Sequence, residues 1–149
     1  MSDSNIALVR RWFEEVWNQG RPEVMEELLA DDAPVYDVAG PRDSVRGPAG
    51  FRPAYDKLRG AFPDINFTID EAIGERDMVA VRWTAQMTHC GDQLGCAATN
   101  NPCTVGGMSF ARVRDGKVVE AWNNWDMMGL MQQIGQITQT MVVPQDEPG

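Results

Sequence analysis

The sequence predicts an α+β fold in which a mainly antiparallel sheet packs against helices from the N-terminal part of the chain. Two observations support this prediction. Apolar residues recur mostly at helical spacing as far as residue 62, whereas from residue 65 onwards they alternate with polar residues as in strands. Helices followed by a run of strands are typical of α+β domains, whose helices cover one face of the sheet. At 149 residues, the chain is expected to form one domain (1–149) with a core of about 4–138.

The first part of the chain contains the helical patterns. A first apolar stripe lies between Ser4, a suitable N-cap, and Gly20, a suitable helix end. Pro22 suits the first turn of a second helix, residues 33–38 are predicted to form a short strand, and Gly47 precedes a third helix. The apolar residues expected to point inward are Ile6, Val9, Phe13, Val16, Trp17, Met25, Leu28, Leu29, Phe51, Tyr55, Leu58 and Phe62.

The second part has the two-residue period of strands. Residues 65–70 and 78–89 are alternating segments. Residues 91–102 are polar and contain glycine, so they are predicted to form a long loop, which in a compact domain is often a binding loop. A hairpin and a last helix beginning near Asp126 follow, and the tail 140–149 is expected to be disordered.

The terminal hairpin turns at Asp115-Gly116 and allows two registers. With a two-residue turn, Ser109 would oppose Trp122, and Asn123 would point to the other side of the sheet. With a three-residue loop and a left-handed bulge at Gly116, Ser109 would oppose Ala121 and share its side with Asn123. We prefer the second register, because it gathers one wall that an enclosed pocket would need: Ser109, Ala111, Val119, Ala121 and Trp125.

Charge and composition limit the partners and cofactors. A net charge of −9 argues against nucleic acid and against an anionic membrane surface. The sequence has no apolar run of about 20 residues and no basic-then-apolar signal, so a soluble cytoplasmic protein is expected. His89 and the three cysteines match no zinc spacing, so no metal is expected. Met108, Phe110 and Trp122 would lie on the outer sheet face, where an exposed apolar set favours a homodimer interface.

Several segments together resemble the SnoaL-like polyketide cyclases, a branch of the NTF2-like superfamily that includes ketosteroid isomerase. Besides the terminal hairpin, they are Trp17-Asn-Gln-Gly20, Glu27-Leu-Leu-Ala-Asp-Asp32, Ala61-Phe-Pro-Asp64 and Val79-Ala-Val-Arg-Trp-Thr84. The resemblance implies a cone-shaped fold whose curved, mixed sheet wraps around N-terminal helices and encloses a hydrophobic pocket. It also implies an enzyme without a cofactor that closes rings or isomerises a hydrophobic, polyketide-like carbonyl compound by proton transfer.

The resemblance suggests catalytic positions, and the chain departs from the family at some of them. Asp37 stands where ketosteroid isomerase keeps its proton-abstracting aspartate, but that enzyme's two oxyanion donors are replaced by Phe13 and Ser109. The acid/base aspartate of the cyclases is replaced by Asn123, whose amide forms hydrogen bonds but exchanges no proton near neutral pH. His89 is the only histidine, and it lies in a segment similar to one found in these proteins.

We therefore predict that Asp37 and His89 carry protons while Asn123 and Ser109 polarise a substrate oxygen. The residues expected to contact substrate are Phe13, Tyr36, Trp83, Ser109, Trp125 and Asp126. Structural roles are the alternatives: Asp37 would end a strand, His89 would be a hydrogen-bonded core residue, and Asp126 would cap the last helix.

Two other functions stay open at this point, and with them the question of whether the chain is an enzyme. The first is a ligand-binding protein without catalysis, which the departures at Asn123 and Ser109 favour. The second is addition of water to an epoxide through an Asp-Arg-Asp relay. The candidates for that relay are Asp37, Arg82 and Asp126, although Arg82 has the opposite strand parity.

Overall fold

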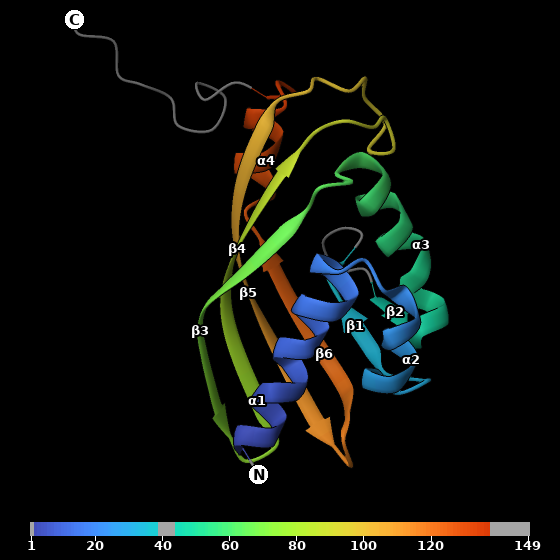
Figure 1. The fold of residues 1–149 in the computed structure, drawn as a ribbon, viewed down its shortest axis with the longest axis vertical. Coiled ribbons are helices and arrows are strands. Elements are labelled where there is room, and N and C mark those ends of the chain that lie inside the picture. The colour runs from blue at the N-terminus through green and yellow to red at the C-terminus, as the bar shows by residue number, and fades with distance from the viewer. Residues whose placement is uncertain (1, 39–43, 138–149) are drawn as a thin grey trace, which may run out of the picture.

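A computed structural model describes residues 2–38 and 44–137, and a curved sheet dominates it (Figure 1). The sheet has six strands in the order β2-β1-β6-β5-β4-β3. The strands are β1 (Pro34–Tyr36), β2 (Ser44–Arg46), β3 (Asn66–Glu75), β4 (Met78–Thr88), β5 (Pro102–Arg114) and β6 (Lys117–Trp125). Strand β1 runs parallel to β6 and every other pair is antiparallel, so the predicted α+β class and mixed sheet are confirmed.

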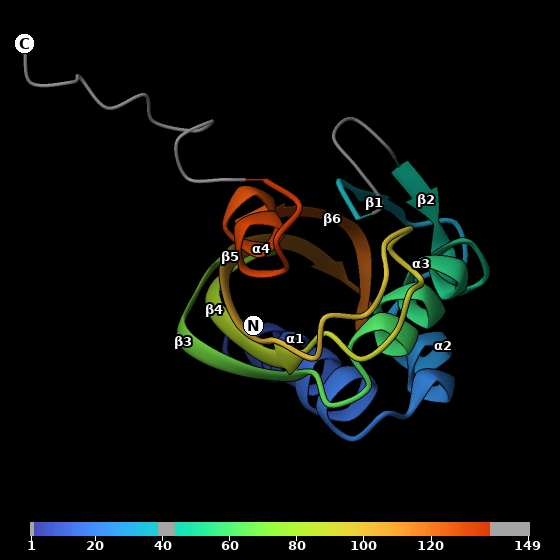
Figure 2. The same ribbon diagram turned by 90° about the horizontal axis from the view of Figure 1, so that it is seen from above.

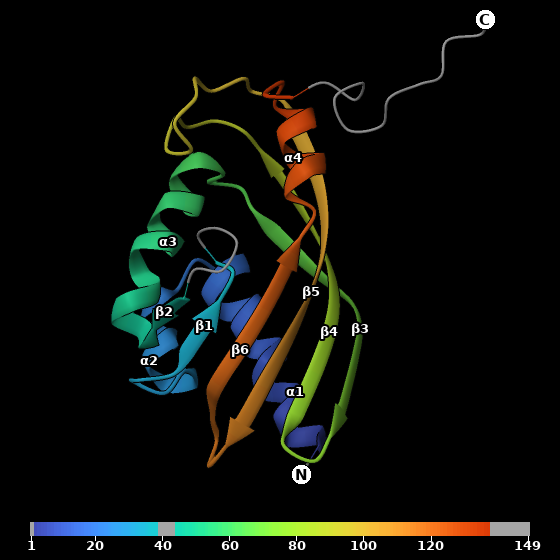
Figure 3. The ribbon, with the colours of Figure 1, turned by 180° about the vertical axis from the view of Figure 1, so that it is seen from behind.

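The helices close the concave side of the sheet, as the view from above shows (Figure 2). They are α1 (Ser2–Arg11), a π-helical segment η1 (Trp12–Asn18), a 3-10 turn η2 (Pro22–Val24), α2 (Met25–Leu28), α3 (Gly47–Ala61) and α4 (Met127–Gln133). From behind, β1 lies beside β6, and α4 follows directly from the end of β6 (Figure 3). None of the helices within the described ranges has the length and apolar character needed to cross a membrane. The predicted tail, 140–149, lies outside those ranges.

The π-helical segment η1 is fixed to its neighbours by polar contacts at its end. The Asn18 side chain pairs with the main chain of Phe67, accepting from its N–H at 2.7 Å and donating to its carbonyl at 2.8 Å. The Tyr55 hydroxyl donates to the Val16 carbonyl at 2.8 Å, which satisfies one of the carbonyls that a helix end leaves unpaired. These contacts hold η1 against β3 and α3, and they give a physical reason for asparagine directly after Trp17.

Gly47 begins α3 in a conformation that favours glycine. Its φ is +65°, and a Cβ atom there would lie 1.9 Å from the main-chain oxygen of Asp31. Only a residue without a side chain fits both conditions. The start of α3, and with it the angle at which this helix covers the sheet, is therefore set by this glycine.

The hairpin register differs from both registers considered for the sequence. Arg114 pairs with Lys117 across a two-residue turn, in which Asp115 and Gly116 have φ values of 51° and 75°. The register then shifts, because Arg112 pairs with Glu120 but the next residue of β5 pairs with Val118. The residue left over is Val119, so a bulge in β6, and not a three-residue loop, supplies the extra residue.

As a result, Ser109 lies directly opposite Asn123. The prediction that these two residues share one side of the sheet is confirmed, although the predicted pairing of Ser109 with Ala121 is wrong. The bulge also changes the wall, because Val118 is buried and Val119 is only half-buried.

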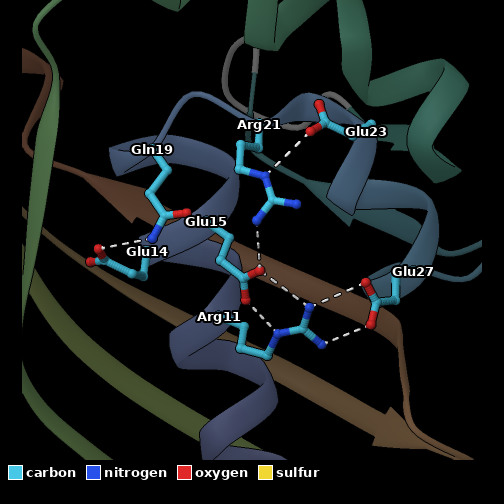
Figure 4. Close-up of polar contacts among 7 residues, drawn as sticks. All are labelled: Arg11, Glu14, Glu15, Gln19, Arg21, Glu23 and Glu27. Atoms are coloured by element: carbon cyan, nitrogen blue, oxygen red, sulfur yellow. Dashed lines mark hydrogen bonds and ion pairs between the residues drawn. The ribbon is translucent and has the colours of Figure 1, made fainter.

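Ion pairs connect the N-terminal helices on the outer side of the molecule (Figure 4). Arg11 binds Glu15 one turn further along the chain and Glu27 in α2, the latter at 3.0 Å. Arg21 binds Glu15 and Glu23, each at 3.3 Å. Hydrogen bonds from Arg11 hold the pKa of both Glu15 and Glu27 below the usual value of 4.5.

These pKa shifts predict a loss of stability in acid. Because the unfolded chain binds more protons than the folded chain near the carboxylate pKa, the free energy of unfolding should fall from about pH 5 towards pH 3. Glu27→Gln should make this decrease shallower. Glu26→Gln is the matched control, since Glu26 lies in the same helix and makes no ion pair within the described residues. Urea unfolding over a pH series measures the slopes, and equal slopes for the two variants would contradict the prediction.

Candidate functional site

An apolar pocket of about 710 Å³, including its open mouth, lies between the concave face of the sheet and helices α1, η1 and α3. Most of this volume lies at the open mouth or close against the walls, because the centre of a water-sized molecule can occupy only about 70 Å³ of it. Eight of its lining residues are aromatic: Trp12, Phe13, Trp17, Phe51, Phe67, Trp83, Phe110 and Trp125. Apart from the indole N–H groups, the only polar side chains among the described lining residues are those of Ser109 and Asn123.

These two side chains belong to a continuous chain of hydrogen bonds. The Trp83 indole Nε1–H donates to Ser109 Oγ at 3.1 Å, and the Ser109 hydroxyl donates to Asn123 Oδ1 at 2.8 Å. Asn123 Nδ2 then donates to the main-chain carbonyl oxygen of Tyr36 at 3.1 Å. The chain joins β4, β5, β6 and β1, so the whole width of the central sheet positions the amide of Asn123.

Trp83 is held in place by close packing. Its side chain is 2% exposed, and its ring contacts those of Phe67 and Trp125 with centroid distances of 5.0 and 5.5 Å. It lies opposite Gly107 in the β4–β5 pair, and a Cβ atom on Gly107 would come within 2.2 Å of the indole Cζ2. The glycine therefore provides the space that the indole fills.

The chain belongs to the SnoaL-like polyketide cyclase family. The family model matches residues 7–134, which is most of the sequence. Membership supports a cyclase- or isomerase-type role, and it confirms the family resemblance seen in the sequence. No functionally curated protein matches the chain significantly.

Solved structures agree with the family. IdmH from Streptomyces antibioticus, a candidate polyketide cyclase, is 28% identical, with 88% of this chain and 98% of that one covered at a TM-score of 0.78. A candidate SnoaL-like polyketide cyclase from Jannaschia sp. CCS1 is 21% identical, with 91% and 94% covered at a TM-score of 0.82. AclR from Streptomyces galilaeus, a candidate hydroxylase, is 24% identical, with 99% and 87% covered at a TM-score of 0.82. The last two show the shared fold.

Five of the predicted site residues meet at the pocket: Phe13, Trp83, Ser109, Asn123 and Trp125. Tyr36 contributes only its carbonyl, because its ring lies on the outer face, stacked on Trp122 at a centroid distance of 5.8 Å. Asp126 caps α4, where its carboxylate accepts the Gly129 N–H at 2.9 Å, and it is not among the lining residues. The geometry at Asp126 therefore matches the capping alternative.

Asp37 lies next to the pocket without being among its lining residues. It follows β1 directly, between Tyr36, whose carbonyl holds Asn123, and Val38, which lines the pocket. It is half-buried, and its φ is +60°. Such a conformation is uncommon outside glycine, and non-glycine residues that adopt it cluster at functional sites.

His89 is buried at the end of β4, away from the pocket lining. Its Nδ1 accepts the main-chain N–H of Thr99 at 3.3 Å and lies 3.0 Å from the Thr99 hydroxyl. Its ring packs beside Phe62 at a centroid distance of 5.5 Å, and its Nε2 has no hydrogen-bond partner. His89 thus ties the end of β4 to the far side of the loop 89–101.

Two of the three residues considered for an epoxide-hydrolysing relay, Arg82 and Asp126, are engaged in different places. Arg82 pairs with Glu71 at 2.8 Å on the exposed side of β3 and β4, and its side chain is 50% exposed. Asp126 caps α4. The side-chain environments of Arg82 and Asp126 therefore give no support to this alternative.

Sequence reasoning missed the contribution of the N-terminal aromatic residues and of the indole N–H. Four aromatic residues that were expected to pack in the core or were left unassigned also line the pocket: Trp12, Trp17, Phe51 and Phe67. The Trp83–Ser109 hydrogen bond was missed because the two residues are 26 positions apart. Gly107 was a usable signal, since a glycine opposite a tryptophan on neighbouring strands indicates that the ring lies flat over it.

Replacing Gly107 should therefore disturb the site. We expect Gly107→Ala to lower the free energy of unfolding by about 1–3 kcal/mol, because a buried indole must move. Gly106→Ala is the control: nothing lies within 4 Å of its Cβ position, so stability should stay the same or rise by up to about 1 kcal/mol. Urea unfolding followed by circular dichroism measures both variants. Equal free energies of unfolding would contradict the prediction, because they would show that the indole moves aside without destabilising the protein.

Proposed function

We propose that this protein is an enzyme that closes a ring in, or isomerises, a hydrophobic polyketide-like carbonyl compound without a cofactor. The observation that carries the proposal is the aromatic pocket with one polar point in its wall, where Ser109 and Asn123 meet. Family membership and the likeness to IdmH, a candidate polyketide cyclase, support the same reaction class. The flat indole and phenyl walls suit a planar or polycyclic substrate.

Asn123 is the group proposed to bind the reacting carbonyl. Its Nδ2 carries two hydrogens, of which one is used by Tyr36, and its Oδ1 is already bound by Ser109. The second N–H can donate to a substrate oxygen as negative charge develops there. A preorganised donor in a pocket that excludes water stabilises such charge more than water would.

Asp37 is the proposed base. It would remove a proton from the carbon next to the polarised carbonyl, which leaves an enolate held by Asn123. The enolate carbon attacks a second carbonyl carbon of the same molecule, and the C–C bond formed closes the ring. The alkoxide that results takes the proton back from Asp37, so the base is regenerated and no co-reactant is consumed. His89 takes no part in the proposed proton transfer, because its Nδ1 accepts from Thr99 and the residue does not line the pocket.

Two substitutions test this proposal with a panel of aromatic polyketone substrates. Asn123→Leu keeps the side-chain size but removes both hydrogen-bonding groups, so turnover should fall by about 10²–10³-fold while binding is retained. Asp37→Asn should lower turnover by about 10²–10⁴-fold. Product formation is followed by liquid chromatography with mass spectrometry, and binding by quenching of the pocket tryptophans. Asn124→Leu, on the exposed side of the same strand, is the control. Full turnover in both variants would contradict the proposal.

A binding protein without catalysis is the second candidate function. The observation that favours it is that no Asp, Glu, His or Lys is among the described lining residues. Tight binding by the unmodified protein with no product from any member of the panel would favour this candidate.

We further propose that two copies of the chain associate through the outer sheet face. Paired positions place a row of largely apolar residues across five strands: Ile73, Ala80, Phe110, Trp122 and Tyr36. Phe110 is 51% exposed, and Met108 beside it is 58% exposed. This row carries no charge, so in a chain with a net charge of −9 it can meet its own copy without opposing carboxylates.

Charged substitutions test the association. Phe110→Glu should convert a dimer to a monomer in light scattering coupled to size exclusion, because it buries an unpaired carboxylate at each copy. Met128→Glu, at a residue 52% exposed on α4, should leave the mass unchanged. A monomeric unmodified protein would contradict the proposal.

A further inference from the structure

The hydrogen-bond chain through the pocket wall has a fixed direction. It begins at the indole N–H of Trp83, which can only donate, and it ends at the carbonyl oxygen of Tyr36, which can only accept. Between these ends, the Ser109 hydroxyl must donate towards Asn123, and the Asn123 amide must turn its oxygen to Ser109 and its nitrogen to Tyr36. The Tyr36 carbonyl fixes which edge of the amide carries the nitrogen, and the Ser109 hydroxyl, which accepts from Trp83, then donates its single hydrogen to the amide oxygen.

This direction places a chemical requirement on residue 123. Its edge towards Tyr36 must carry a hydrogen, because two oxygens 3.1 Å apart without a hydrogen between them would repel each other. An amide meets this requirement, and so does a protonated carboxylic acid. An ionised carboxylate does not, since both of its oxygens only accept.

We infer that Asn123 serves as a permanently neutral counterpart of a carboxylic acid, and that Trp83 and Ser109 are positioning residues that hold its amide in one orientation. The inference deepens the proposed function, because it says what kind of group faces the substrate. Residue 123 offers a hydrogen to an acceptor oxygen and exchanges no proton with it. Its donor is therefore present at any pH at which the protein is folded.

The inference is testable without a substrate by introducing the titrating form. In Asn123→Asp, the carboxyl should stay protonated well above the usual aspartate pKa of about 3.9, with a titration midpoint about 1–3 pH units higher. The probe is ¹³C NMR of protein labelled at the aspartate carboxyl carbon, read as the resonance absent from the unmodified protein. Asn124→Asp is the matched control, since residue 124 is exposed on the other face of the same strand. Equal midpoints for the two variants would overturn the inference.

A second pair of variants tests the positioning role. Ser109→Ala in the Asn123→Asp background removes the hydroxyl that stabilises the ionised carboxylate, so the midpoint should rise by about another pH unit. Trp83→Phe in the same background keeps an aromatic ring but removes the indole N–H and so frees the Ser109 hydroxyl to turn away, so it should act in the same direction with a smaller effect. Side chains that only filled space would leave the midpoint unchanged, and an unchanged midpoint in both variants would overturn the positioning role.

If Asn123→Asp fails to fold, the unmodified protein provides the measurement. In ¹⁵N-labelled protein, one of the two Asn123 side-chain amide hydrogens should exchange slowly with water, because it is bonded to Tyr36, and the other should exchange faster. Equal and rapid exchange of both hydrogens would overturn the inference. These results do not depend on turnover, so they remain interpretable if the proposed enzymatic function is wrong.

Discussion

The packing of Trp83 against its aromatic neighbours is the interaction on which the pocket depends. The indole fills the space over Gly107 and contacts Phe67 and Trp125. On the helical side, the Phe13 ring lies at a centroid distance of 6.4 Å from the Trp83 ring. Because the sheet must curl to bring strands β3 to β6 around one ring, its curvature and the position of the helices are linked. Without that ring, the inner face would have neither a fixed shape nor a donor for Ser109.

The same packing explains how so few polar atoms can remain on the pocket wall. A buried polar group without a partner is costly, so each one here is paired across strands. Trp83 donates a hydrogen bond to Ser109, Ser109 donates one to Asn123, and Asn123 donates one to the carbonyl of Tyr36. What is left for a ligand is the second hydrogen of the amide and spare acceptor capacity at the same point. Apolar area can then give affinity, while one hydrogen-bonding point fixes the orientation of the guest.

The period of the sequence predicted the fold class and much of the site for a clear reason. Long strands keep their parity, so Trp83 on β4 could be assigned to the inner face from the pattern, whereas the placement of Ser109 beside Asn123 depended on the hairpin register and their site roles on the family resemblance. The hairpin register was wrong because a bulge at Val119 leaves no mark in an alternating sequence. Tyr36 was misplaced because β1 has three residues, too few to show a parity. His89 has inward parity but stands just past the end of its strand, where loop contacts and not the sheet decide its surroundings.

The residue type at position 123 decides whether the hydrogen bonds of the pocket wall are kept or a proton can be exchanged there. A carboxylate there would be able to exchange a proton with a substrate, but it would lose the bond to Tyr36 and place a charge in an apolar wall. The amide keeps all three hydrogen bonds of the chain but cannot exchange a proton. In the proposed reaction Asn123 only polarises an oxygen, so the proton transfer is assigned to another group, and Asp37 is adjacent in the chain to the residue that holds the amide. Its backbone is left-handed, which is unusual for a residue with a side chain and is found most often at functional sites. An amide on β6 and an aspartate with a left-handed backbone after β1 are consistent with the proposed division of roles between a hydrogen-bond donor and a base.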